Sequence, residues 1–285
     1  MKKISHHQLL RQLGIDSRRV LLLPFNTKNY LIESNCTESN RNFQLMQYRT
    51  SQSSKNDISK YGGMNNKDWD QLWRDQSTPW DTKQPSPILR HLVETIYKDR
   101  TDIKHALVPG CGNGYDADTL SALKSVETVI GLDISETAIA SANTKKSQFT
   151  YGHPDKVQFI CQDFFALDKK FDIIFDYTFL CALPISLREA WAQQMKKLLN
   201  DKDNANAELV TLIFPLSKRT NTGDLDTDIT KGPPYILSYP VVEKLLVDAG
   251  FENIEHYNVP SQFSHPARAN NEIIARWKVK KVSKL

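Results

Sequence analysis

The sequence predicts an α/β fold: a doubly wound, mostly parallel sheet of seven strands, with helices on both faces and an antiparallel terminal hairpin. Three observations lead to this prediction. Short apolar runs alternate with helix-like stretches from residue 105 to residue 250, a pattern typical of a parallel sheet. A glycine turn directly follows the first of these runs. Two further strand-like runs come last with no helix between them, and they must pair antiparallel because a parallel return needs a long crossover.

Each element follows from its local pattern. Apolar runs of strand length predict five buried strands at residues 105–110, 128–135, 157–164, 171–179 and 207–215, and two terminal strands at 251–259 and 271–279. Helix-like stretches lie between them at 115–125, 136–147, 186–200 and 239–250. Ser135 and Ser186 are expected to act as N-caps, and Gly250 is expected to close the last helix.

The bulk composition is that of a single globular domain with an extension. The chain has 285 residues, 40% of them apolar and 25% charged, and a net charge of +4. So slight a charge argues against a nucleic-acid surface, and no apolar run approaches the ~20 residues of a membrane span. The four cysteines show neither CxxC nor His-paired spacing, so we expect reduced thiols and no metal site.

Residues 1–62 differ from the rest of the chain. They are rich in Ser, Asn, Gln, Lys and Arg without an apolar period, which predicts a disordered extension before a folded domain at 63–285. The first thirty residues hold six Lys or Arg and one acid, Asp16, as a mitochondrial presequence does. The alternatives are an unstructured tail and a mis-assigned start, with Met64 as the true one.

Three glycines, Gly110, Gly112 and Gly114, follow the first predicted strand. Glycine lets a backbone approach a ligand closely, with the next helix N-terminus facing that ligand. The dinucleotide fingerprint GxGxxG is incomplete here, because Tyr115 takes its sixth position. The turn alone is also what a tight structural turn requires.

Acidic residues end the next three predicted strands. Asp133 lies 23 residues after the first glycine of the turn, where a carboxylate can accept both hydroxyls of a ribose, and this suits NAD and S-adenosylmethionine alike. Asp163 and Phe164 suit an adenine, by hydrogen bonding and stacking, and Asp176 and Tyr177 end the fourth strand. Each acid alone is also explained as a helix N-cap. Ligands of open α/β sheets bind beyond the carboxyl ends of the strands, so the four turns converge on one crevice.

Three of the five tryptophans, Trp69, Trp73 and Trp80, fall within the polar stretch DWDQLWRDQSTPWD. Trp69 and Trp73 are four residues apart and share one face of a helix. We expect residues 66–82 to form a lid helix that folds over the crevice with its aromatic side chains inward. A helix packed on the core is the alternative.

The chain from about residue 69 to residue 280 resembles the thiopurine/thiol/halide methyltransferase family, above all its plant and fungal thiol and halide branch. The matching stretches are WDQLWRDQSTPWD, ALVPGCGNGYD, VIGLDIS, FDIIFDYTFLCAL, REAWAQQM, TLIFPL, GPPY and RWK. This resemblance implies the seven-stranded class I methyltransferase fold with S-adenosyl-L-methionine as cofactor. It also implies a small soft nucleophile as acceptor: a halide, thiocyanate, hydrosulfide or thiol, with thiopurines in one branch. Residues 1–62 have no counterpart.

The same resemblance implies a role for each candidate residue. The positions that match cofactor contacts are Trp69, Trp73, Trp80, Gly110, Gly112, Asp133, Asp163, Phe164 and Tyr177. The tryptophans enclose the cofactor, Asp133 holds the ribose, and Asp163 with Phe164 holds the adenine. Tyr177 lies beside the methyl group and is the expected catalytic residue.

Methyl transfer from a sulfonium to an anion needs alignment in a dry pocket more than it needs a general base. Aromatic faces hold the sulfonium by cation–π attraction. Arg188 and Trp191 are expected on the acceptor side. The alternatives are core packing for Trp191, and pairing with Glu189 or contact with solvent for Arg188. Two other functions stay open: an NAD-dependent oxidoreductase, which shares the glycine turn and Asp133, and a methyltransferase fold that has lost its activity.

The chain ends in Ser283-Lys284-Leu285, which is a peroxisomal address read by an import receptor. We therefore expect a peroxisomal or a cytoplasmic protein, and a mitochondrial location is less favoured. The expected partner is a small-molecule or anion acceptor, with neither nucleic acid nor membrane. Nothing forces an oligomer on a single domain of this size, so a monomer is expected.

Overall fold

The computed structural model describes residues 64, 66–217 and 232–281; the predicted extension at 1–62 and Ser283-Lys284-Leu285 lie outside them. Its centre is a seven-stranded sheet in the order β3-β2-β1-β4-β5-β7-β6. The strands are β1 (His105–Pro109), β2 (Thr128–Asp133), β3 (Val157–Cys161), β4 (Ile173–Tyr177), β5 (Glu208–Ile213), β6 (Phe251–Asn258) and β7 (Ile273–Val279). Strands β1 to β5 pair in parallel, and β7 runs antiparallel to both β5 and β6. The predicted fold class is confirmed.

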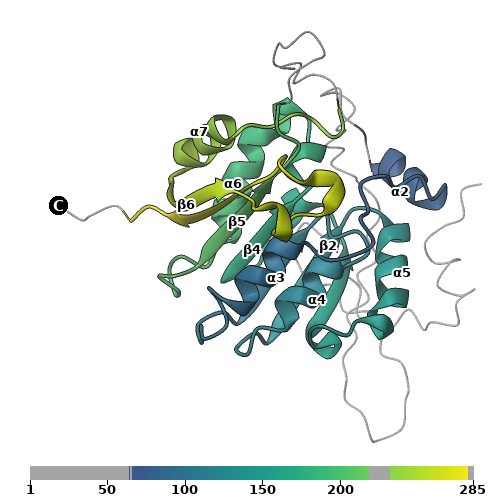
Figure 1. Cartoon of the computed structure of the whole chain (residues 1–285), viewed down its shortest axis with the longest axis horizontal. Coiled ribbons are helices and arrows are strands. Elements are labelled where there is room, and N and C mark those ends of the chain that lie inside the picture. The colour runs from purple at the N-terminus through teal and green to yellow at the C-terminus, as the bar shows by residue number, and fades with distance from the viewer. Residues whose placement is uncertain (1–63, 65, 218–231, 282–285) are drawn as a thin grey trace, which may run out of the picture. The chain divides into compact units, whose positions relative to one another are not determined.

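Helices cover both faces of this sheet (Figure 1). They are α2 (Asn66–Arg74), α3 (Pro87–Glu94), α4 (Tyr115–Ser121), α5 (Glu136–Lys145), α6 (Arg188–Leu198) and α7 (Tyr239–Ala249). Side chains of α3 and α4 pack on one face together with Ala106 of β1, and side chains of α6 and α7 pack on the other face together with Leu107. Neighbouring strand residues point to opposite faces and both faces are buried, so the strands read as continuous apolar runs. No helix in the described part of the chain has the length and apolarity to cross a membrane.

Two of the three predicted helix caps are found. The Ser135 hydroxyl accepts a hydrogen bond from the Ala138 N–H at the start of α5, and Gly250 closes α7 with a φ of 96°. Ser186 is not the N-cap of α6, so that prediction was wrong. Residues 185–187 form a separate 3-10 turn, η7 (Ile185–Leu187), and α6 begins only at Arg188.

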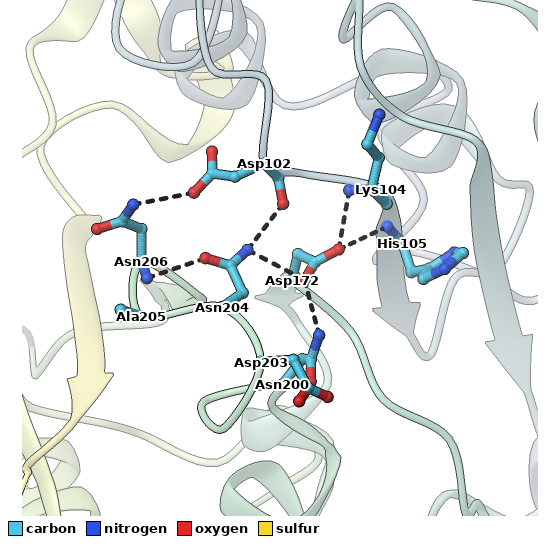
Figure 2. A pocket seen from close by; sticks show the side chains of 9 residues that line it. All are labelled: Asp102, Lys104, His105, Asp172, Asn200, Asp203, Asn204, Ala205 and Asn206. Carbon is cyan, nitrogen blue, oxygen red and sulfur yellow. Dashed lines mark hydrogen bonds between the residues drawn. The ribbon is translucent and has the colours of Figure 1, made fainter.

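A polar network closes the amino ends of the strands, opposite the predicted crevice (Figure 2). One oxygen of Asp172 accepts hydrogen bonds from the backbone N–H groups of Lys104 and His105, at 2.8 and 3.0 Å. Its other oxygen accepts from the amides of Asn200 and Asn204, at 3.1 and 3.0 Å. The pocket of about 510 Å³ beside them is therefore lined by groups that already serve the fold. Nowhere in the described ranges do three or more potential metal-ligating His, Cys, Asp or Glu side chains gather.

A second network lies at the amino end of β5 and is built around Glu208, which is 5% exposed. Its carboxylate accepts hydrogen bonds from the Tyr97 hydroxyl at 3.0 Å and from the Arg100 guanidinium at 2.7 Å. Arg276 of β7 adds two more, at 2.8 and 3.0 Å. One buried carboxylate thus joins β5 and β7 to the segment that follows α3.

Candidate active site

The glycine loop after β1 lies against aromatic side chains. Gly110 and Gly112 have φ values of +60° and +51°, in the left-handed region that favours glycine. A Cβ on Gly110 would lie 2.8 Å from Cδ2 of Phe179, and one on Gly112 would lie 3.2 Å from Cζ2 of Trp73. The loop therefore needs glycine both for its backbone and for the close approach of these rings. The loop lies at the carboxyl end of β1, where the sequence analysis placed the glycine turn.

Asp133 ends β2 and faces this loop. Its Oδ2 accepts a hydrogen bond from the Gly112 N–H at 3.0 Å, and its Oδ1 accepts from the Ser135 N–H at 3.0 Å. Burial raises the pKa of the Asp133 carboxyl, although these hydrogen bonds oppose the rise. A carboxylate has about four lone-pair sites, so each oxygen keeps capacity for one ligand hydroxyl. This geometry fits the two hydroxyls of a ribose.

The turn after β3 holds the predicted adenine contacts. The Asp163 side chain caps the short turn η5 (Phe164–Ala166) by accepting from the Phe165 N–H at 2.9 Å. Phe164 is only 4% exposed, and its ring packs edge-on against Phe165 and Phe179, at centroid distances of 5.3 and 5.0 Å. Asp163 is half-buried after β3, whereas Phe164 belongs to the core, and the contacts of both residues with an adenine stay a prediction.

The lid is attached to the sheet domain through helix α2. Asp70 accepts hydrogen bonds from the Ser135 hydroxyl at 2.8 Å and from the Thr137 N–H at 2.9 Å, at the start of α5. The bond from Thr137 is the main reason that the pKa of Asp70 is lowered. Further along, Asn113 of the glycine loop donates to Asp81 at 2.6 Å. The lid is therefore anchored at Asp70, directly after Trp69, and at Asp81, directly after Trp80.

Helix α2 ends at Arg74, well before residue 82, so the predicted helix is shorter and its second half consists of turns. The Ser77 N–H bonds to the Leu72 carbonyl at 2.9 Å and the Gln76 N–H to the Trp73 carbonyl at 3.2 Å. Gln76 has a φ of 55°. These bonds and this left-handed residue form a Schellman motif, which stops a helix. The turn folds Trp80 back onto Trp69 and Trp73, at centroid distances of 5.4 and 6.3 Å.

We expect Trp73→Ala to weaken binding of S-adenosylhomocysteine or S-adenosylmethionine by about 3- to 30-fold, the range of a lost cation–π contact. Trp73 is only partly buried, so the melting temperature should change little. Calorimetric titration and thermal melting of the same sample check both statements, with Trp73→Phe as the variant that keeps an aromatic face. A fall in melting temperature with unchanged affinity would show that the Trp73 ring stabilises the fold and does not contact the cofactor.

The acceptor side is built around Tyr177 at the end of β4. Its hydroxyl donates to a carboxylate oxygen of Glu272 at 2.6 Å, and the other oxygen of Glu272 accepts from the Ser264 hydroxyl. Burial raises the pKa of Tyr177 well above its usual range. The Arg268 guanidinium lies 4.9 Å above the Tyr177 ring and 4.5 Å above the ring of Phe214. Tyr177 is therefore held as a neutral hydrogen-bond donor.

Arg268 connects this side to the lid. It is 7% exposed, and its Nη2 donates to the backbone carbonyl of Trp80 at 2.6 Å. Its Nη1 is buried and has no hydrogen-bond partner in the described part of the chain. Arg268, Glu272 and Phe214 were not predicted as site residues. Their local sequence gives no sign of this role, because they lie outside the α-helices and strands and far from Tyr177 in the sequence.

The other polar residues near β4 serve the fold. Asp176 accepts from the Trp191 indole N–H at 2.8 Å and from the Leu180 N–H at 3.1 Å, and burial raises its pKa to about 6. Trp191 is fully buried, which confirms the core-packing alternative. Burial also raises the pKa of the Cys181 thiol to about 12, so it stays protonated and is not a nucleophile.

A parallel sheet with β7 inserted antiparallel, a glycine loop after β1, a carboxylate at the end of β2 and an aromatic segment beside that loop define a class I methyltransferase that uses S-adenosylmethionine. The chain belongs to the thiopurine S-methyltransferase (TPMT) family, whose family model matches residues 64–281.

Relatives in plants cover most of the folded domain. "Probable thiol methyltransferase 2" of Arabidopsis thaliana is 39% identical over 212 residues, which are 74% of this chain and 84% of the relative. "Thiocyanate methyltransferase 1" of the same plant is 36% identical over 215 residues, 74% of this chain and 83% of the relative.

Solved structures support the fold. A glycopeptide N-methyltransferase (MtfA) complexed with S-adenosyl-L-methionine superposes with a TM-score of 0.52 at 16% identity, over 70% of this chain and 96% of that one. The structure described as "Conversion of a Disulfide Bond into a Thioacetal Group during Echinomycin Biosynthesis" gives 0.54 at 19% identity, over 76% and 93%. These similarities concern the fold alone.

Proposed function

We propose that the chain methylates a small anionic soft nucleophile, which is a thiolate, hydrosulfide, thiocyanate or halide. The observation that carries this proposal is the environment of the Arg268 side chain. Its guanidinium is buried, its Nη1 has no hydrogen-bond partner among the described residues, and it lies over Tyr177 and Phe214 beside the lid. A buried guanidinium with one nitrogen that makes no hydrogen bond is costly. An anionic acceptor held between Arg268 and the sulfonium would satisfy both positive charges.

The residues of the site suit such a transfer. S-adenosylmethionine supplies a methyl group on a cationic sulfur. The tryptophans of the lid and the rings of Tyr177 and Phe214 keep water away, which favours a reaction in which opposite charges cancel. Arg268 orients the nucleophile for in-line attack. Tyr177 does not act as a base, because it is neutral and its one hydroxyl proton is donated to Glu272. No base is required, since the acceptor arrives as an anion.

The names of the plant relatives, a thiol and a thiocyanate methyltransferase, fit this acceptor class. The competing NAD-dependent oxidoreductase is not supported, because β7 is inserted antiparallel between β5 and β6, whereas dinucleotide-binding sheets continue in the order 4-5-6. The peroxisomal address stays a proposal that rests on the sequence of residues 283–285, outside the described ranges. The monomeric state stays a proposal as well.

A competition assay with methyl-labelled cofactor tests the acceptor class. Thiocyanate, iodide, hydrosulfide and a neutral amine of similar size compete in one reaction, and the methylated products are separated and counted. We expect labelled product from the anions and little from the amine. Absence of methylation of every anion would contradict the proposal and favour a fold that has lost its activity.

Arg268 variants test the anchor. We expect Arg268→Met to lower kcat/KM for thiocyanate by about 10- to 100-fold, the range of a lost charged hydrogen bond. Arg268→Lys keeps the charge and should retain part of the activity. Affinity for S-adenosylhomocysteine separates an effect on the acceptor from loosening of the lid at Trp80. Equal losses in cofactor affinity and in kcat/KM would assign Arg268 to the lid alone.

A further inference from the structure

A second buried arginine on the acceptor side has no role in the site described so far. Arg188 is the first residue of α6 and is 3% exposed. Its Nε and Nη2 atoms are buried and find no hydrogen-bond partner anywhere in the described ranges. Arginine is almost never buried without a partner, because five N–H donors lose their water. Something outside the described chain must satisfy this group.

The position of Arg188 at the start of its helix makes its charge more unfavourable still. A helix N-terminus carries partial positive charge, so a cation in the first turn is unfavourable there. Glu189 follows in sequence but is exposed, and none of the ion pairs of the described residues includes Arg188. Burial lowers the pKa of its guanidinium. An anion beside Arg188 would relieve each of these costs.

Arg188 lies close to the segment that follows β4. Its guanidinium carbon lies 5.7 Å from the centroid of the Tyr235 ring. The Tyr235 N–H in turn bonds to the Cys181 carbonyl at 2.7 Å. Burial sets the high pKa of the Cys181 thiol, and the charges of both Arg268 and Arg188 act against that rise. Arg268, beside Tyr177, and Arg188, beside Tyr235, are thus both close enough to Cys181 to influence the ionisation of its thiol.

We propose that Arg188 binds a carboxylate on the tail of the acceptor, so that the preferred substrate is a short mercapto acid. This inference rests on the proposed methylation of an anionic nucleophile. Arg268 holds the thiolate end and Arg188 holds the carboxylate end through charge-assisted hydrogen bonds. The thiolate sulfur forms a bond to the methyl carbon as the bond from that carbon to the sulfonium breaks. The electron pair of the broken bond stays on the cofactor sulfur, and no proton moves.

Two buried cations near the segment that follows β4 also give a reason for selectivity. A neutral thiol or a bare anion leaves Arg188 without a partner, and a site built to bond a polar group discriminates against ligands that lack it. The distance between the two guanidinium groups selects the length of the chain that joins the thiolate to the carboxylate of the acceptor. Thiocyanate or iodide would therefore be accepted through Arg268 alone and would make no use of Arg188.

Steady-state kinetics on matched thiols tests this assignment. The probes are mercaptoacetate, 3-mercaptopropionate and 4-mercaptobutyrate, with methyl 3-mercaptopropionate and 2-mercaptoethanol as neutral partners and thiocyanate as the tail-free reference. Rates are expressed per thiolate. For the wild-type protein we expect kcat/KM for the best mercapto acid to exceed that of its methyl ester by about tenfold or more, or 1.4 kcal/mol.

Variants of Arg188 assign the preference to this residue. Arg188→Met should bring the ratio of acid to ester to about one and should lower activity on the mercapto acid about tenfold more than activity on thiocyanate. Arg188→Lys should restore part of the ratio. The matched control, Glu189→Gln, changes an exposed charge on the same helix turn and should leave the ratio as it is. Acetate should compete with the mercapto acid in the wild-type protein and not in Arg188→Met.

Three results would overturn the inference. One is a wild-type ratio of acid to ester near one, which needs no variant. Another is an equal loss for the mercapto acid and thiocyanate in Arg188→Met or, if that variant does not fold, in Arg188→Lys. The third is absence of methylation of thiocyanate and of all thiols, which would remove the proposed function itself. Methylation of thiocyanate without preference for mercapto acids would remove only the role of Arg188.

Discussion

Replacing Asp133 by asparagine is expected to weaken binding of S-adenosylhomocysteine by about 100- to 1000-fold. The carboxylate can accept two ribose hydroxyls, and a hydrogen bond to a charged group contributes about 1.5–3 kcal/mol, while each 1.4 kcal/mol is about tenfold in affinity. Asparagine keeps the shape of the side chain but removes the charge and one acceptor. Isothermal titration of the wild-type and variant proteins measures the difference.

The variant has a second effect that the experiment must separate. Oδ1 and Oδ2 of Asp133 accept from Ser135 and Gly112, so the asparagine NH₂ would face one of these N–H donors. We therefore expect a lower melting temperature as well, and affinity must be measured far below it. A cofactor analogue that lacks both ribose hydroxyls completes a double-mutant cycle. If loss of the hydroxyls lowers affinity by the same factor in the wild-type and Asp133→Asn proteins, Asp133 does not hold the ribose.

Local sequence patterns were sufficient to predict the strands of the sheet and the positions of the glycine turn and Asp133. Gly110, Gly112 and Asp133 lie at strand ends, where the turn after a parallel strand fixes the position of the next few residues. Their neighbours in space are therefore their neighbours in sequence, or residues at the end of an adjacent strand. This is why the glycine turn and the carboxylate at the end of the next strand could be predicted from the sequence, whereas the hydrogen bond between Gly112 and Asp133 emerged only in the structure.

The acceptor side could not be predicted in the same way. Arg268 contacts the ring of Tyr177 and the backbone carbonyl of Trp80 in the lid, although these three residues are far apart in the sequence. Such contacts depend on how loops cross the end of the sheet. Neither the hydrophobic periodicity of the sequence nor its helix-capping residues indicate the path of these loops. The lid was misjudged for a related reason. A left-handed Gln76 stops α2, and glutamine gives no signal for that conformation.

The ion cluster around Glu208 is the place where one substitution is expected to affect folding most. Glu208→Gln removes the carboxylate charge that the Tyr97 hydroxyl and one guanidinium nitrogen of Arg100 contact, and it also weakens two bonds from Arg276. Two arginine side chains that are 17% and 12% exposed then lose their shared countercharge. Breaking a buried ion pair by removing one partner costs about 3–5 kcal/mol. Arg100 keeps its ion pair with Asp102 and Arg276 keeps its pair with Glu255, so we expect a loss at the lower end of this range.

A loss of this size should be plain in unfolding experiments. For a domain of this size each kcal/mol shifts the melting temperature by about 2–4 °C, so Glu208→Gln should melt roughly 10 °C lower. Glu255→Gln is the matched control: it also bonds Arg276, at 2.7 Å, but its side chain is 40% exposed, and exposed pairs contribute about 0–1 kcal/mol. Affinity for S-adenosylhomocysteine, measured well below both transitions, should stay the same, because the cluster lies at the amino ends of the strands and the cofactor crevice lies at their carboxyl ends. Equal melting of the two variants would mean that solvent, and not Glu208, compensates the arginines.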